Sequence, residues 1–246
     1  MDDVDEIQKL FNAKAGSWDR KYDTKGPLAF RVSVFSGVVA RILRPGSLIL
    51  DFGCGTGAIS AELASQGYSV TACDIAEKMI ERGKSLHAEQ PITWVLLPAG
   101  WKKFPFEANS FDAIIASSVF EYLRDPDSVF RECSRILGPG GKLIVSVPDP
   151  KHPVRRLERL IRPFSFLTMG KLWARAWPKL ANYSIYLRRS QARLSPDEWG
   201  QRARRAELSL KTAPDLDTDL AINKALMFLV FERVSSGIKP AHSVLH

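Results

Sequence analysis

The chain has 246 residues, of which 45% are apolar and 25% charged. This is the size and composition of one globular domain, and it excludes a collagen-like, coiled-coil or disordered protein. The acidic start, Met1 to Glu6, differs from a secretory signal, and the three cysteines are odd in number without CxxC spacing. We therefore expect a cytoplasmic protein without disulfides or a zinc site.

The net charge of +8 is concentrated in one part of the chain, because residues 151–211 contain 15 Lys and Arg against four Asp and Glu. Such a local excess predicts contact with an anionic substrate, a membrane surface or nucleic acid. The longest apolar run, Ala225 to Phe231, is far too short to span a bilayer, so we expect it to be a buried strand.

Taken in chain order, the predicted elements begin with helix across residues 4–43, which ends at Arg44-Pro45-Gly46. Strands and helices then alternate. The expected strands are residues 47–51, 69–73, 93–97, 111–116 and 142–147, and the expected helices are residues 58–65, residues 76–88 and one from Asp125-Pro126 to Gly138-Pro-Gly-Gly141. This alternation predicts a parallel sheet with helices on both faces.

The last part of the chain breaks the alternation. Residues 208–213 and 225–234 are two expected strands with too short a connection for a crossover helix, so they should form an antiparallel hairpin. The basic segment before them predicts a lid. Its first helix has apolar Leu157, Leu160, Ile161 and Phe164 beside Arg155, Arg156, Arg159 and Arg162, and should end at Pro163. A second helix should lie between Ser165 and Pro178.

The strongest motif is a strand that ends at Asp51 and runs directly into Gly53-Cys54-Gly55-Thr56-Gly57 and a helix. Glycines there let the backbone approach a ligand closely, and the free amides at a helix start favour an anionic group. Asp74, at the end of the second strand, can accept hydrogen bonds from both ribose hydroxyls. The structural alternatives are a plain tight turn and an Asp74 that only caps the helix from Ala76.

These features alone leave a dinucleotide oxidoreductase possible, since Gly53, Gly55 and Ala58 also fit GxGxxA. Further motifs distinguish the two, and with them the chain resembles the class I S-adenosylmethionine-dependent methyltransferases that act on small molecules. The matching segments are Asp51-Phe-Gly-Cys-Gly-Thr-Gly57, Asp74, Phe104-Pro-Phe-Glu-Ala-Asn-Ser-Phe-Asp112, Ser117-Ser-Val-Phe-Glu-Tyr-Leu-Arg-Asp-Pro126 and Leu137-Gly-Pro-Gly-Gly-Lys-Leu-Ile-Val145.

The resemblance implies a Rossmann-like α/β fold with a seven-stranded sheet of order 3-2-1-4-5-7-6, in which strand 7 is antiparallel. It also implies S-adenosylmethionine as cofactor. Asp51, Gly53, Cys54, Gly55 and Gly57 would hold its methionine end, Asp74 the ribose and Ile75 the adenine, while Ser117 and Ser118 would lie beside the sulfonium. Trp101 would stack on the adenine or fill the core, and Trp18 and Tyr22 resemble aromatic residues that cover the cofactor in relatives.

We expect methyl transfer by in-line displacement to a small-molecule acceptor, with O-methylation favoured and an acceptor that is anionic or lipid-linked. Glu121 and His152 are the candidate general bases. Some related enzymes carry an acidic-and-histidine metal cluster where this chain has Ser118, Glu121 and Tyr122, so no metal is expected. The alternatives are a nucleic-acid methyltransferase, an NAD(P)-dependent oxidoreductase and a non-catalytic nucleoside-binding module.

One domain with four parts accommodates these expectations. Residues 1–46 would form a helical cap, residues 47–150 the cofactor-binding core, residues 151–207 a basic substrate lid, and residues 208–246 the closing hairpin and tail.

Overall fold

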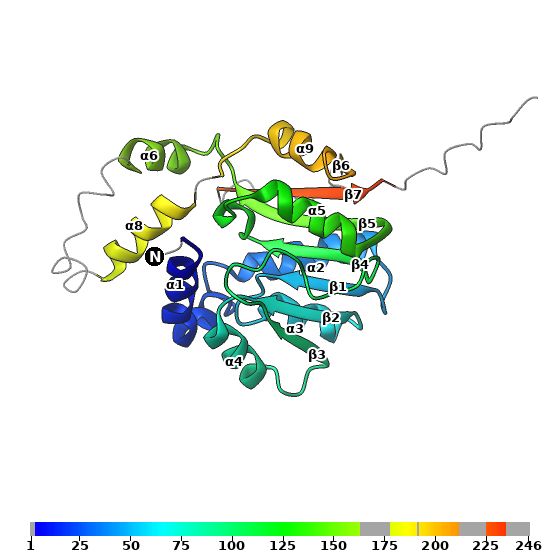
Figure 1. Cartoon of the computed structure of the whole chain (residues 1–246). Helices are drawn as coiled ribbons and strands as arrows, with labels where there is room; N and C mark the ends of the chain where they lie inside the picture. Colours follow the sequence, from blue (N-terminus) through cyan, green and yellow to red (C-terminus); the bar gives the residue numbers. More distant parts are fainter. Residues whose placement is uncertain (1–2, 163–177, 191, 212–224, 235–246) are drawn as a thin grey trace, which may run out of the picture.

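The computed structural model describes residues 3–162, 178–190, 192–211 and 225–234. Its strands form one seven-stranded sheet of order β3-β2-β1-β4-β5-β7-β6 (Figure 1), in which β7 runs antiparallel to both of its neighbours. The strands are β1 (Leu48–Phe52), β2 (Ser69–Asp74), β3 (Ile92–Leu96), β4 (Phe111–Ser117), β5 (Leu137–Pro148), β6 (Leu208–Lys211) and β7 (Leu226–Arg233). The expected strand order and closing hairpin are confirmed.

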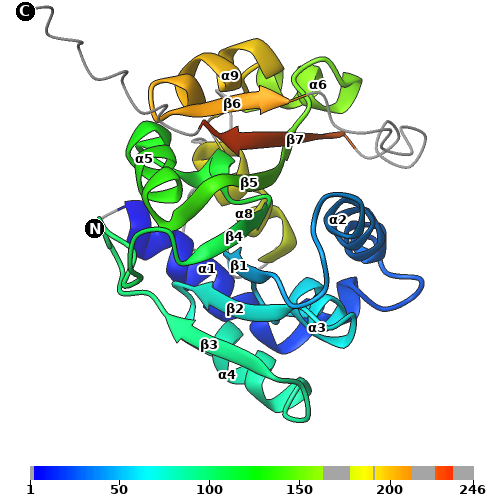
Figure 2. The same cartoon turned by 90° about the vertical axis from the view of Figure 1, so that its right-hand side faces the viewer.

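Helices cover both faces of this sheet, with α5 and α9 on one face and α2 and α3 on the other (Figure 2). The described helices are α1 (Asp3–Trp18), α2 (Ala29–Ile42), α3 (Ala58–Ser65), α4 (Glu77–Leu86), α5 (Pro126–Ile136), α6 (Pro153–Ile161), α8 (Pro178–Arg189) and α9 (Pro196–Arg204), with short 3₁₀ turns η1 (Asp19–Lys21) and η2 (Phe120–Tyr122). Within the described residues, none of them is both long and apolar enough to cross a membrane.

Each face of the sheet has its own core. Phe130 of α5 and Trp199 of α9 are fully buried on one face, and Phe35 of α2 and Leu63 of α3 on the other. Because both faces are covered, the central strands are mostly apolar, as is usual for parallel strands buried on two sides. The strand order reverses between β1 and β4, and in open α/β sheets ligands bind at the carboxyl ends of the strands at such a point.

The structure differs from the sequence expectations in three places. The helical stretch expected over residues 4–43 is broken between Trp18, where α1 ends, and Ala29, where α2 begins. Pro27, which has no amide proton for a helix, lies in this break. Gly138 to Gly141 do not end α5; they belong to β5, which already pairs with β4 at Leu137 and Phe111. The second predicted lid helix, between Ser165 and Pro178, lies outside the described residues.

The third difference concerns α9, which was expected to be part of the lid. Its Trp199 is 1% exposed and meets the rings of Phe120 and Phe130, with centroids 6.0 and 6.1 Å apart. Ala203 lies one turn later on the same buried face. The carboxyl-terminal part of the basic segment therefore belongs to the hydrophobic core.

Trp94 of β3 explains why two nearby positions, 57 and 83, carry glycine. A Cβ atom at Gly57 would lie 2.3 Å from Cη2 of the Trp94 ring, and one at Gly83 in α4 would lie 2.5 Å from the same atom. Glycine inside a helix costs about 1 kcal/mol relative to alanine, so its presence at position 83 needs a packing reason. The indole ring fills the space that a side chain would need.

We expect Gly83→Ala to lower the free energy of unfolding by about 1–3 kcal/mol, because overpacking outweighs the better helix propensity of alanine. Gly16 in α1 is the matched control, since a Cβ atom there would contact nothing within 4 Å. Gly16→Ala should stabilise the protein by about 0.5–1 kcal/mol. Urea unfolding measures both, and equal stabilisation by the two substitutions would contradict the role given to Trp94.

Candidate active site

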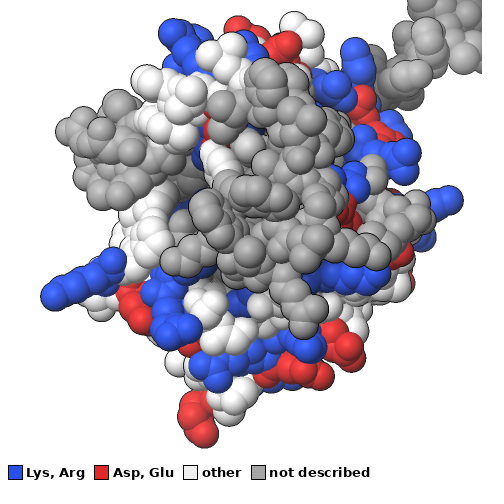
Figure 3. Space-filling view, turned by 90° about the vertical axis from the view of Figure 1, so that its left-hand side faces the viewer, with Lys and Arg blue, Asp and Glu red and all other residues white. Residues whose placement is uncertain are grey.

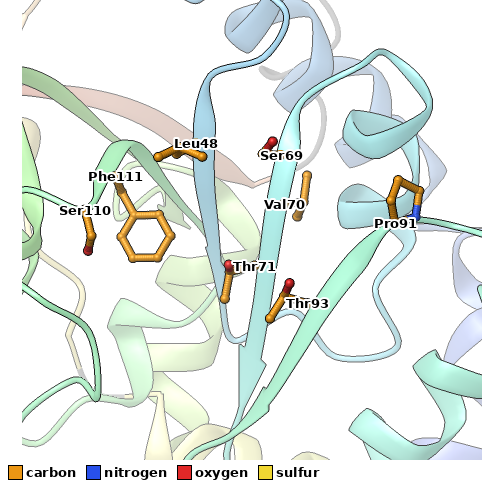
Figure 4. A pocket seen from close by; sticks show the side chains of 8 residues that line it. All are labelled: Leu48, Ser69, Val70, Thr71, Pro91, Thr93, Ser110 and Phe111. Carbon is orange, nitrogen blue, oxygen red and sulfur yellow. The ribbon is translucent and has the colours of Figure 1, made fainter.

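A hollow of about 360 Å³ lies at the amino ends of the strands (Figure 4) and is the wrong place for the expected chemistry. Its lining residues stand at or near the beginnings of β1 to β4: Leu48, Ser69, Val70, Thr71, Pro91, Thr93, Ser110 and Phe111. Ligands of open α/β sheets bind at the opposite, carboxyl edge. The residues expected to form the site lie at that opposite edge.

The glycine loop after β1 has a backbone conformation that favours glycine. Gly53, Gly55 and Gly57 all have positive φ angles, of 72°, 56° and 79°, a region that other residues rarely adopt. A Cβ atom at Gly53 would lie 2.4 Å from Cγ2 of Val119, and one at Gly55 would lie 2.8 Å from Nε1 of Trp18. The loop is therefore closely covered from two sides, by the segment after β4 and by α1.

Asp74 organises this loop from the end of β2. Its carboxylate accepts hydrogen bonds from the Gly55 amide at 2.9 Å and from the Ala76 amide at 2.8 Å. Burial raises the pKa of Asp74, while these amide donors oppose the shift. Each oxygen keeps a further lone pair, so the structural role and the expected ribose contact are compatible.

Asp51, the last polar residue of β1, is buried with one oxygen unsatisfied. The Ser60 hydroxyl donates to its Oδ2 at 2.6 Å, whereas Oδ1 has no partner in the described part of the chain. Burial raises the pKa of Asp51 to about 7. An unpaired buried acceptor costs about 1–3 kcal/mol, so a ligand that brings a hydrogen-bond donor gains affinity here. The ammonium group of a methionine moiety is such a donor.

Helix α1 closes over the loop and over the start of α4. The Gln8 side chain donates to the Ile75 carbonyl at 2.8 Å, and the Asn12 side chain accepts from the Lys78 amide at 3.0 Å. These contacts place Trp18, at the end of α1, beside Gly55. Trp18 thus lies beside the loop, as its resemblance to covering aromatic residues implies.

Arg31 of α2 is a site residue that the sequence predictions missed. Its guanidinium donates to the Ser117 hydroxyl at 3.1 Å, and its Nε is buried without a partner among the described residues. The Tyr22 hydroxyl lies beside Arg31 and Ser117. Burial raises the pKa of this hydroxyl, and Arg31 opposes the shift. The available signal was a single arginine in the otherwise uncharged, mostly apolar stretch from Leu28 to Phe35.

Glu121, one of the two expected bases, is 3% exposed in η2. Burial raises its pKa to about 7, whereas the charges of Arg31 and Arg155 and the hydroxyl of Ser118 lower it. Its Oε2 has no hydrogen-bond partner in the described residues. Ser118 has a φ angle of 56°, an uncommon conformation for a residue with a side chain and one that is often found at functional sites. A carboxyl with a pKa near neutrality can accept a proton at physiological pH.

Aromatic rings surround Glu121 on the side of α1 and α8. The Tyr122 ring meets Phe11 of α1 at a centroid distance of 5.7 Å and Tyr186 of α8 at 6.3 Å. Tyr186 stacks on Tyr183 at 5.8 Å. This arrangement gives the candidate site an aromatic wall that suits a flat or apolar acceptor.

Trp101, His152 and Cys54 have structural contacts of their own. Trp101 stacks on Phe104 at 4.3 Å within the core, which favours the core role over the adenine contact. His152 accepts a hydrogen bond from the Val154 amide at 3.3 Å through Nδ1 and so caps α6. Burial raises the pKa of the Cys54 thiol well above its usual value, so this loop cysteine stays a thiol.

In the part of the chain that the structure describes, no group of three or more His, Cys, Asp and Glu side chains could hold a metal ion.

Comparison with known proteins gives methyltransferases among the matches. Residues 50–145 match the family model described as "Methyltransferase domain". A ubiquinone biosynthesis O-methyltransferase of Xanthomonas campestris pv. campestris (strain B100) is 29% identical over 213 residues, which cover 84% of this chain and 81% of that protein. Another of that name, from Caulobacter sp. (strain K31), is 32% identical over 133 residues. This second match covers 54% of the present chain and about half, 49%, of the relative.

Solved structures of methyltransferases share the fold at low sequence identity. The magnesium protoporphyrin IX methyltransferase of Synechocystis PCC 6803 with bound S-adenosylmethionine superposes with a TM-score of 0.64 at 18% identity, covering 95% of this chain and 98% of that one. The phosphoethanolamine N-methyltransferase 2 of Haemonchus contortus, in complex with S-adenosyl-L-methionine, superposes with a TM-score of 0.64 at 14% identity. This match covers 96% of the present chain and 60% of that one.

Proposed function

Because the chain contains a class I S-adenosylmethionine-dependent methyltransferase domain, we propose that it methylates a hydroxyl oxygen of a small-molecule acceptor. The observation that carries this proposal is the buried Glu121 carboxyl with one unpaired oxygen. It lies in the segment after β4 that also covers the glycine loop through Val119. A proton acceptor is thereby held close to the expected donor site.

The residues at the carboxyl edge of the sheet fit S-adenosylmethionine, which supplies an electrophilic methyl group on a sulfonium centre. The unpaired Oδ1 of Asp51 suits its ammonium, and the glycine loop from Gly53 to Gly57, at the carboxyl end of β1, suits its methionine end. Asp74 has lone pairs left for ribose hydroxyls, and Ile75 follows it beside the expected adenine. Arg31 suits a carboxylate.

Glu121 would accept the proton of the acceptor hydroxyl as the methyl group passes from the sulfonium sulfur to the oxygen, which would leave S-adenosylhomocysteine. Deprotonation makes the oxygen a better nucleophile, and the pKa of about 7 lets the carboxyl hold that proton afterwards. The half-buried rings of Phe11, Tyr122 and Tyr186 would help to exclude water and orient the acceptor. His152 would serve α6 as a cap, although its Nε2 remains a second candidate base.

Transfer of labelled methyl groups to a catechol acceptor, with and without EDTA, tests this function. We expect transfer that survives chelation and is not increased by magnesium or zinc, because Ser118 and Tyr122 cannot complete a cluster of acidic and histidine ligands with Glu121. Activity that is lost with EDTA and restored by a divalent ion would contradict a metal-free Glu121 mechanism. Absence of transfer to any hydroxyl acceptor would contradict O-methylation.

The cap and the lid of the expected domain division remain part of the proposal. We assign residues 1–46 to the cap, and we restrict the lid to α6 and α8, because α9 packs in the core. Helix α6 has its ion pairs on the side that faces the protein. Arg155 is hydrogen-bonded to Glu158 at 2.9 Å, and Glu158, only 4% exposed, also pairs with Arg193 at 2.7 Å.

The opposite side of α6 is apolar and exposed. Val154, Leu157 and Leu160 are 48%, 58% and 70% exposed, and Arg156 and Arg159 are exposed beside them. An exposed apolar stripe flanked by arginines suits an anionic lipid surface. Lys and Arg side chains are distributed over the described surface at this end of the molecule (Figure 3). We therefore assign the outer side of α6 to membrane contact that brings a lipid-linked acceptor to the site.

Vesicle sedimentation tests this assignment. The wild type should bind vesicles that contain phosphatidylglycerol more tightly than pure phosphatidylcholine vesicles, and salt should weaken the binding, since exposed charges are screened over roughly 8 Å at physiological ionic strength. Leu157→Ser with Leu160→Ser, and Arg156→Glu with Arg159→Glu, should both reduce it. Leu86→Ser in α4, 39% exposed in the wild type, is the matched control. Equal binding by all variants would contradict the assignment.

A further inference from the structure

Two lysines of the amino-terminal cap lie half-buried on aromatic rings. Lys14 shares one face of α1 with Phe11 and Trp18, because residues three, four and seven apart lie on one side of a helix. Its ammonium is 5.5 Å from the centroid of the Phe11 ring, and that of Lys21 is 4.0 Å from the Trp18 ring. Among the described residues, no carboxylate lies within ion-pair distance of either lysine.

These two cations repel each other, and Arg31 adds a third. The pKa of Lys14 is lowered to about 8, first by burial and then by the charge of Lys21. Burial also lowers the pKa of Lys21, and the charge of Arg31 adds to the shift. Three cations from α1, η1 and α2 are thus gathered in one place. Burying a cation without an anionic partner is unfavourable, so this arrangement is poised for an anion.

The lysines belong to the same side of the molecule as the candidate active site. Trp18, which carries Lys21 on its ring, lies beside Gly55 of the loop. Phe11, which carries Lys14, has its ring against Tyr122, the neighbour of Glu121. An aromatic ring bound along Phe11 and Tyr122 would therefore have the lysines at one end and the Glu121 carboxyl at the other.

We infer that Lys14 and Lys21 form a subsite for an anionic group, a carboxylate or a phosphate, that the methyl acceptor carries. The inference rests on the proposed function and names the part of the acceptor that lies away from the methylated hydroxyl. Ammonium groups form strong charge-assisted hydrogen bonds with both anions, and the partial burial here limits screening by salt. The aromatic rings beneath the ammonium groups keep them in place while leaving their N–H groups available.

Calorimetric titration of the full chain saturated with S-adenosylhomocysteine tests this subsite, with benzoate and inorganic phosphate as separate probes. Lys14→Gln with Lys21→Gln should weaken binding of the favoured anion by about tenfold or more. Lys14→Arg with Lys21→Arg should restore most of the affinity because it keeps both charges. Lys25→Gln, which removes an exposed lysine of the same segment, should leave binding unchanged.

The two probes distinguish the source of the anion, since tighter binding of benzoate indicates a ring carboxylate and tighter binding of phosphate a phosphoryl group. Unchanged affinity for both anions in the double glutamine variant would overturn the inference. Weaker binding of S-adenosylhomocysteine to that variant, with anion binding intact, would also overturn it and assign the lysines to the cofactor. Failure of the wild type to bind S-adenosylhomocysteine would contradict the proposed function itself, whatever the lysines bind.

Discussion

Glu121→Gln should lower kcat/KM for methyl transfer by about 100-fold to 10,000-fold, the range that a lost general base produces. Glutamine keeps the size of the side chain but cannot accept the hydroxyl proton. The carboxyl is buried, and one of its oxygens is unpaired in the described residues. Because of this burial, a water molecule cannot easily take over the role of proton acceptor in the variant. Binding of S-adenosylhomocysteine should stay unchanged, because Glu121 is assigned to the acceptor side.

The pH profile gives an independent readout of the same residue. Burial raises the pKa of Glu121 to about 7, and only the ionised carboxylate can act as a base. The wild-type rate should therefore rise as the pH passes through about 7 from below and then level off, and the Gln variant should lack this rise. Glu89→Gln, at an exposed glutamate, is the control. A Glu121→Gln enzyme with wild-type kcat and the same pH profile would remove Glu121 from the mechanism.

Asp74→Ala should weaken binding of S-adenosylhomocysteine by about 1–3 kcal/mol, or about fivefold to 150-fold in Kd. The substitution removes the expected acceptor for the ribose hydroxyls. It also leaves the amides of Gly55 and Ala76 without the carboxylate that holds them at 2.9 and 2.8 Å. The glycine loop should consequently lose part of its fixed conformation, which adds to the loss of affinity.

A second variant separates the two causes. Asp74→Asn keeps one carbonyl oxygen for the loop amides but loses the negative charge, so its affinity should lie between those of the wild type and Asp74→Ala. Asp23→Ala, at an exposed position before α2, controls for a general effect of charge removal. Isothermal titration gives Kd, and thermal unfolding shows whether each variant is folded. Wild-type affinity in a folded Asp74→Ala protein would exclude Asp74 from the cofactor site.

The sheet and the glycine loop could be predicted because local signals determine them. Alternating apolar strands and helices imply the parallel sheet, and the three glycines at alternate positions after β1 mark the loop, where the structure gives all three positive φ angles. Gly57 shows the limit of this reasoning. Its lack of a side chain also serves Trp94 of β3, and no local pattern links a glycine to a ring 37 residues away.

Long-range partners account for most of what the sequence did not predict. Arg31 looked like an isolated charge on α2, and its relation to Ser117 depends on how α2 crosses the carboxyl edge of the sheet. Helical spacing on α6 separated an apolar side from a charged one, but it could not tell which side faces the protein. Glu158 decides this, because the ion pairs that it forms with Arg155 and Arg193 hold the charged side inward.

The most direct test of the central claim is a parallel calorimetric titration of the wild-type chain with S-adenosylhomocysteine and with NADH. The methyltransferase assignment predicts that one molecule of S-adenosylhomocysteine binds per chain and that NADH does not bind. Binding of NADH without binding of S-adenosylhomocysteine would contradict the account, since the glycine loop would then serve a dinucleotide.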